Sequence, residues 1–134
     1  MSSRIYIVYA PEDHQYSERL INQAKTAKLD ARFERMEAKL PWVPLWKGQC
    51  RTKVRECDAA IVLLSKKTNQ GVGIGWELEC ASEAQMPLLG VHVDKYEKGS
   101  APAELKGCPI IDWNWPEIAG FIQGLSKDKW TARA

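Results

Sequence analysis

The chain has 134 residues, of which 45% are hydrophobic, and this is the size of one compact domain with a single core. Its 19 basic and 17 acidic side chains give a formal net charge of +2 without a long basic stripe, so nucleic acid is not an expected partner. The apolar run near the amino end is too short for a signal peptide, and no segment reaches the roughly 18 apolar residues of a membrane span, so we expect one cytoplasmic domain, residues 1–134, without a membrane partner.

A buried strand and an amphipathic helix are predicted first. Residues 4–10 (RIYIVYA) are an apolar run that indicates a strand, which Pro11 ends. Asp13 can then cap a helix. The apolar side chains of this helix keep helical spacing, at Tyr16, Leu20, Ala24 and Ala27.

The next stretch of the chain is less regular. A shorter strand is expected near residues 31–36. A loop is favoured after it by two prolines and two tryptophans, Pro41, Trp42, Pro44 and Trp46. A short helix marked by Cys50, Val54 and Cys57 follows.

The second half of the chain continues the alternation of strands and helices. Residues 58–65 (DAAIVLLS) form an unbroken apolar run typical of a central parallel strand, and Ser65 lies at its carboxyl end. The glycine-rich GVGIG opens a helix that contains Glu77. Two more strands and a closing helix are expected at residues 87–93, 108–113 and 114–125.

This alternation predicts an α/β fold with a parallel sheet of about five strands and helices on both faces, as in flavodoxin-like folds. Ligands of such sheets bind beyond the carboxyl ends of the strands. Tyr9, Ser65 and the start of the Glu77 helix should meet at that edge.

Glu77 has an unusual place on its predicted helix. At ~100° per residue it falls inside an apolar arc, whereas Glu79 and Glu83 project to the opposite, polar side. The arc consists of Ile74, Trp76, Leu78, Cys80, Ala81 and Ala84. One reading of Glu77 is structural, because a carboxylate in the first turn of a helix gains ~0.3 to 1 kcal/mol from the peptide dipoles.

The loops argue against other chemistries known on this architecture. A phosphate-accepting receiver domain needs an aspartate where this chain has Ser65, and no hydroxyl-rich phosphate loop of the flavodoxin kind follows the first strand. The glycines of GVGIG lack the dinucleotide fingerprint. Reduced, mostly buried thiols without a metal site are expected from four scattered cysteines, Cys50, Cys57, Cys80 and Cys108.

Three blocks of the sequence resemble a known family. They are IYIVYAPEDHQYSERL, CDAAIVLLSKKT and GWELECASEAQMPLLGVHV, within residues 4–93. They resemble bacterial TIR-like domains, in particular those of the Thoeris type of antiphage defence, with a strand ending in tyrosine, an acidic pair, a strand ending in serine and a Trp-Glu helix. The resemblance implies a TIR-like fold.

The resemblance also implies an activity. The family's catalytic glutamate of NAD cleavage matches Glu77, so NAD is expected as substrate, with no separate cofactor or metal. Self-association after an upstream cue, and a nucleotide product that signals to a downstream effector, are implied as well. The residues that could line the substrate pocket are Tyr9, Ala10, Asp13, Trp46 and Ser65.

A single carboxylate is chemically sufficient for such a reaction. Nicotinamide leaves from a pyridinium that already carries a positive charge, so it needs no proton from a general acid. As the bond stretches, the ribose becomes oxocarbenium-like. A carboxylate screened by little water stabilises that charge best, and a glutamate on an apolar arc meets this requirement.

Alternatives remain open at this point. The same surface, with Trp42 and Trp46, could serve as a non-catalytic association module in which Glu77 merely starts a helix. A relative of the nucleoside deoxyribosyltransferases would also have a site glutamate, but its further acidic residues cannot be placed. Gly71 and Gly73 stand where many relatives carry serine and tryptophan, so pocket walls supplied there by side chains should be missing.

Overall fold

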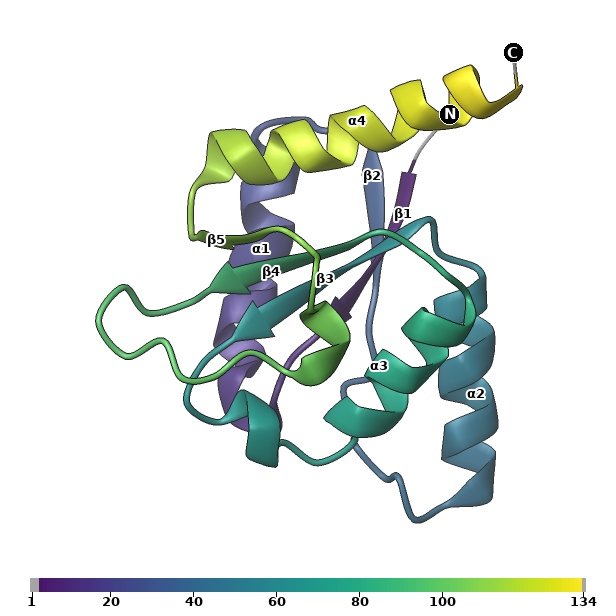
Figure 1. The fold of residues 1–134 in the computed structure, drawn as a ribbon, viewed down its shortest axis with the longest axis vertical. Coiled ribbons are helices and arrows are strands. Elements are labelled where there is room, and N and C mark those ends of the chain that lie inside the picture. The colour runs from purple at the N-terminus through teal and green to yellow at the C-terminus, as the bar shows by residue number, and fades with distance from the viewer. Residues whose placement is uncertain (1–2, 134) are drawn as a thin grey trace.

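The computed structural model describes residues 3–133, with side chains described as far as residue 125. Its centre is one parallel sheet of five strands in the order β2-β1-β3-β4-β5 (Figure 1). The strands are β1 (Ser3–Val8), β2 (Ala31–Glu34), β3 (Ala59–Leu64), β4 (Leu88–His92) and β5 (Ile110–Asp112). This confirms the predicted α/β fold class.

Four helices cover the two faces of the sheet (Figure 1). On one face, α1 and α4 contribute Leu20 and Ile118 to the apolar core, and on the other, α2 and α3 contribute Val54 and Leu78. The helices are α1 (His14–Thr26), α2 (Pro44–Arg55), α3 (Ile74–Glu83) and α4 (Trp115–Arg133). Within residues 3–133, no helix is both long enough and apolar enough to cross a membrane.

The middle strand explains why the sheet forms as it does. Every residue of β3 is buried, because β1 and β4 pair with its two edges and helices cover both of its faces. An unbroken apolar run suits such a position, since neither face meets water. Alternation along β1 sends Tyr6 toward the α2 and α3 face and Tyr9 toward the α1 and α4 face.

Two local expectations were wrong. Pro44 and Trp46 belong to α2, which begins at Pro44, because a proline at the first helical position gives up no hydrogen bond. Asp13 precedes α1, but its carboxylate makes no capping hydrogen bond to the helix. It accepts a hydrogen bond from the Ser65 hydroxyl instead.

The strand order creates the place where a site can form. From β1 the chain crosses to β2 on one side, and β3 pairs with β1 on the other side. At such a reversal the segments that leave the carboxyl ends of the two strands diverge, and ligands of open α/β sheets bind there. Here those segments are the turns at Pro11–Asp13 and Thr68–Gln70.

Candidate active site

Glu77 lies in the first turn of α3 and its side chain is completely buried. Gly73 starts this helix with a left-handed backbone, at φ 84°, which glycine adopts without strain. The Glu77 amide donates to the Gly73 carbonyl oxygen at 3.0 Å, so the helix is already formed at this residue. The carboxylate therefore projects from a rigid element toward the sheet.

Both carboxylate oxygens of Glu77 have partners inside the protein. The Lys39 Nζ donates to Oε1 at 2.8 Å, and the Tyr6 hydroxyl donates to Oε2. The Lys39 side chain is only 2% exposed, so the ion pair is shielded from water. Glu77 is thus held by one charge and one hydroxyl from segments far away in the sequence.

Burial dominates the electrostatics of this cluster. Loss of water raises the pKa of Glu77, while the nearby Lys39 ammonium and the Tyr6 hydroxyl oppose that rise. Burial and the Glu77 charge together raise the pKa of Tyr6 well above its usual value, so the hydroxyl keeps its proton and donates a hydrogen bond to Glu77. Burial likewise raises the pKa of Cys50, 3.7 Å from the Tyr6 hydroxyl, to about 12, so this thiol is not a nucleophile.

Lys39 comes from the 35–43 loop, the irregular segment between β2 and α2. Its Nζ lies 4.3 Å from the centre of the Tyr9 ring, in addition to its contact with Glu77. The loop is tied down next to Lys39, since the Trp46 indole N–H donates to the Ala38 carbonyl oxygen at 2.5 Å. Lys39 therefore closes the space between Glu77 and the end of β1.

Asp13 and Ser65 form a second polar pair at the same edge of the sheet. The Ser65 hydroxyl donates to the Asp13 carboxylate at 2.5 Å and also accepts from the Lys67 amide at 3.0 Å. Burial raises the pKa of Asp13, against the opposing effect of the Ser65 hydrogen bond. The pair joins the segments that leave β1 and β3.

Glycines let the backbone close tightly around this edge. A Cβ on Gly71 would lie 3.0 Å from the Cβ of Ala10, and one on Gly73 would lie 3.1 Å from the Trp46 ring. A Cβ on Gly99 would lie 2.7 Å from the Ser65 carbonyl oxygen. Rather than leaving pocket walls open, these glycines allow neighbouring segments to fill the crevice.

The residues that the sequence predicted around a substrate do not form one cluster in the structure. Tyr9 and Glu77 both contact the Lys39 ammonium. Asp13 and Ser65 form a separate pair. Trp46 packs behind the loop with 4% of its surface exposed. Ala10 contacts the Gly71 segment. Tyr9, Ala10, Asp13 and Ser65 lie at the carboxyl edge of the sheet, whereas Trp46 lies in the first turn of α2, behind the loop that covers this edge.

Sequence reasoning missed both partners of Glu77. Tyr6 carried a weak signal, since strand alternation places it on the face that α3 covers. No signal in the sequence pointed to Lys39, because it lies in a segment without helical or strand periodicity, 38 positions before Glu77.

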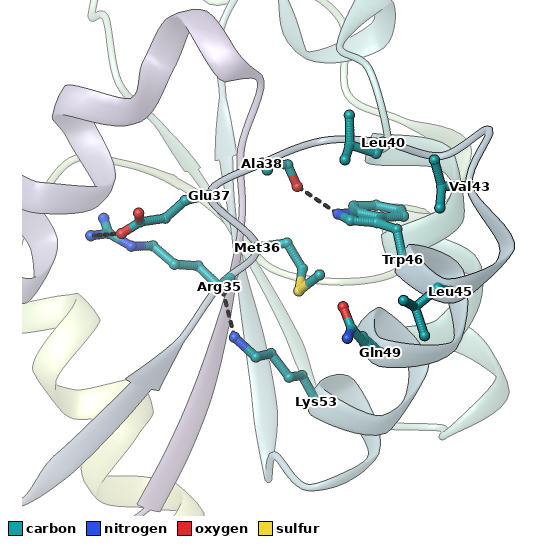
Figure 2. Close-up of a pocket in the computed structure, with 10 residues that line it drawn as sticks. All are labelled: Arg35, Met36, Glu37, Ala38, Leu40, Val43, Leu45, Trp46, Gln49 and Lys53. Atoms are coloured by element: carbon teal, nitrogen blue, oxygen red, sulfur yellow. Dashed lines mark hydrogen bonds and ion pairs between the residues drawn. The ribbon is translucent and has the colours of Figure 1, made fainter.

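A hollow of about 470 Å³ lies on the outer side of the 35–43 loop (Figure 2). Its walls include Met36, Leu40, Leu45 and the buried Trp46, and Lys53 reaches across to the Arg35 carbonyl oxygen at 3.2 Å. Glu77 does not line it. The hollow therefore belongs to the loop and α2 and is separate from the buried carboxylate.

A cluster of possible metal ligands also lies near this loop. Among residues whose side chains the structure describes, His14, Glu18 and Glu37 bring donor atoms within 4.8 Å of one another. The Arg35 guanidinium already binds both carboxylates, Glu18 at 2.7 Å and Glu37 at 3.0 Å. The two carboxylates thus share the single positive charge of Arg35.

Comparison with solved structures identifies this architecture. The TIR domain of a Toll-related receptor from Hydra magnipapillata superposes with a TM-score of 0.62 at 17% identity, over 92% of this chain and 95% of that one. The fold is TIR-like. The SEFIR domain of interleukin-17 receptor B gives a TM-score of 0.61 at 13% identity, over 93% and 95% of the two chains.

The same architecture extends to flavoproteins. A diflavin flavoprotein from Nostoc sp. gives a TM-score of 0.60 at 12% identity, over 98% of this chain and 99% of that one. No family profile matches the sequence, and no curated protein does. At such low identities the TIR-like and flavodoxin-like neighbours show the fold of this chain alone.

Proposed function

We propose that this TIR-like domain consumes NAD by breaking the bond between nicotinamide and ribose, with Glu77 as the catalytic carboxylate. One observation carries the proposal: a fully buried carboxylate at the carboxyl edge of the sheet lies 2.8 Å from a positive charge. An anion kept away from water stabilises a neighbouring cation strongly. The reaction creates such a cation at the ribose.

In this reaction only Glu77 stabilises the developing charge, and Tyr6 orients its carboxylate. The electron pair of the breaking bond moves to the nicotinamide nitrogen, which loses its charge, while positive charge develops on the ribose. Glu77 faces that charge, and the hydrogen bond from Tyr6 holds its carboxylate in place. Water or another part of the nucleotide then adds to the ribose carbon, giving hydrolysis or cyclisation.

The site must open before NAD can reach Glu77. Lys39 occupies the position that the substrate needs, and the 35–43 loop that carries it has no regular secondary structure. Opening therefore means displacement of this loop while α3 and the sheet stay in place. Such a closed resting state suits an enzyme that acts only after a cue.

The biological setting follows from the resemblance to Thoeris domains. We place the protein in the cytoplasm, where its nucleotide product would signal to an effector in antiphage defence. NAD is then the substrate, with no further cofactor, nucleic acid or membrane partner. Self-association would follow that cue, and the side chains of Trp42 in the closing loop and Leu45 in α2, 69% and 71% exposed, offer an apolar surface for it.

A second function is favoured by a different observation. Glu77 is fully buried, while three apolar side chains of the adjacent loop and α2 face solvent, Leu40, Trp42 and Leu45. A non-catalytic association module would show this combination, with the ion pair as a structural feature of the core. NAD turnover separates the two functions.

The test follows NAD by chromatography with concentrated protein, alone and with extract of infected cells. The matched pair is Lys39→Met, which removes the covering charge, and Lys39→Met with Glu77→Gln, which also removes the carboxylate. We expect product from Lys39→Met without extract and a loss of at least about 100-fold in the double variant. Equal product from both variants removes the catalytic role, and no product from any protein, with or without extract, favours the association module.

A further inference from the structure

We infer that the Glu77 carboxylate and the Tyr9 ring form a binding site for a planar organic monocation, and that the chain's own Lys39 fills this site in the closed protein. The identity of the natural ligand rests on the proposed function, but the site itself does not. The Lys39 ammonium lies 2.8 Å from the Glu77 Oε1 and 4.3 Å from the centre of the Tyr9 ring.

The two groups around the ammonium are complementary to a cation in different ways. A carboxylate offers full negative charge, and the face of an aromatic ring attracts cations within about 6 Å. Both act here without competing water, because Tyr9 is 1% exposed and Glu77 is 0% exposed. Low local polarity strengthens both attractions.

The site and its occupant differ in how firmly they are held. Glu77 belongs to α3 and Tyr9 directly follows β1, so both are attached to the body of the fold. Lys39 belongs to the 35–43 loop, whose neighbouring side chains Leu40 and Trp42 are exposed. If this loop moves, which requires the Trp46 indole to release the Ala38 carbonyl oxygen, the ammonium leaves with it and the carboxylate and ring stay in place.

A ligand that replaces Lys39 must carry a positive charge. Removing Lys39 alone leaves a buried carboxylate without a counter-ion, which is costly, so a ligand that brings its own positive charge is favoured over a neutral one. A pyridinium ring combines that charge with a flat face for Tyr9. The oxidised nicotinamide ring fits this description, whereas the neutral, reduced ring does not.

The experiment measures thermal unfolding of Lys39→Ala with small probes and uses neither NAD nor turnover. The n-propylammonium ion replaces the atoms that the substitution removes, and 1-propanol is its neutral counterpart. The 1-methylnicotinamide cation represents the proposed ligand, and its neutral 1,4-dihydro form is the matched control. We expect both cations to raise the Tm of Lys39→Ala by several degrees and the neutral probes to leave it unchanged.

A double variant, Lys39→Ala with Glu77→Gln, shows whether the carboxylate is responsible, since both cations should lose their effect there. If Lys39→Ala does not fold alone, the cations should restore its helical circular dichroism. An equal effect of 1-propanol would make the space a simple void, and no effect of 1-methylnicotinamide would exclude a planar cation; either result overturns the inference. Stabilisation by both cations without NAD cleavage would uphold the site while removing the proposed enzyme.

Discussion

Glu77 and Lys39 are oppositely charged side chains buried together, and their energetics depend on each other. Removing one partner of such a pair costs about 3–5 kcal/mol, because the remaining charge stays in the interior without compensation. Replacing both by uncharged groups of similar size is often close to neutral. The pair is therefore a weak explanation for stability, and a functional reason for keeping it deserves a test.

At the residue scale, we predict that Glu77→Gln lowers the free energy of unfolding by about 3–5 kcal/mol, since it leaves the Lys39 ammonium buried without a counter-ion. Combining it with Lys39→Met should recover most of that loss. Urea denaturation of the wild type, both single variants and the double variant gives the coupling directly. Additive losses in the double variant would show that the two side chains do not depend on each other.

At the scale of elements, the segments that follow the strands close over the sheet edge through glycine contacts. The segment after β3 packs against Ala10, where Gly71 has no side chain to keep it away. The start of α3 packs against Trp46 and the Lys39 stem in the same way through Gly73. The closed site thus depends on the approach of three segments and not on Lys39 alone.

We predict that Gly71→Ala destabilises the fold by about 1–3 kcal/mol, because its Cβ would lie 3.0 Å from the Ala10 Cβ and 2.7 Å from the Ile74 Cγ1. Gly75→Ala is the matched control, since a Cβ there, in the first turn of α3, meets nothing within 4 Å. Alanine in a helix is favoured over glycine by roughly 0.5–1 kcal/mol, so the control should be slightly stabilised. Chemical denaturation compares the two; similar changes for both variants would argue against a tight contact at Gly71.

At the scale of the whole molecule, one end carries both the buried carboxylate and an apolar surface. The exposed side chains are those of Trp42 in the loop and Leu45 in the first turn of α2, and Leu45 also lines the hollow drawn in Figure 2. A contact made by these side chains would act on the same loop that holds Lys39. Association and opening of the site would then be coupled through one short segment.

We predict that replacing Trp42 and Leu45 together by serine reduces self-association at high protein concentration, because their exposed apolar surface is removed. Sedimentation velocity over a concentration series measures this. Tyr96→Ser is the control, since Tyr96 is 87% exposed but lies on the loop after β4. Unchanged association of the double variant would place the contact on another surface.

The sequence alone determined most of the strands and helices and the unusual place of Glu77 on an apolar helix face. Apolar runs such as residues 59–64 specify buried strands, and helical spacing shows Glu77 on an apolar arc, because both patterns arise between near neighbours in the chain. The start of α2 was mistaken for a loop because a proline suits both a turn and a first helical position.

Only the tertiary structure decided what surrounds Glu77. Its partners Tyr6 and Lys39 lie 71 and 38 positions away along the chain, and no local pattern links them to it. Their contacts exist because the sheet order brings β1 next to β3 and the 35–43 loop over the start of α3. A buried charge can be suspected from spacing, but its counter-ion is chosen by the packing of distant segments.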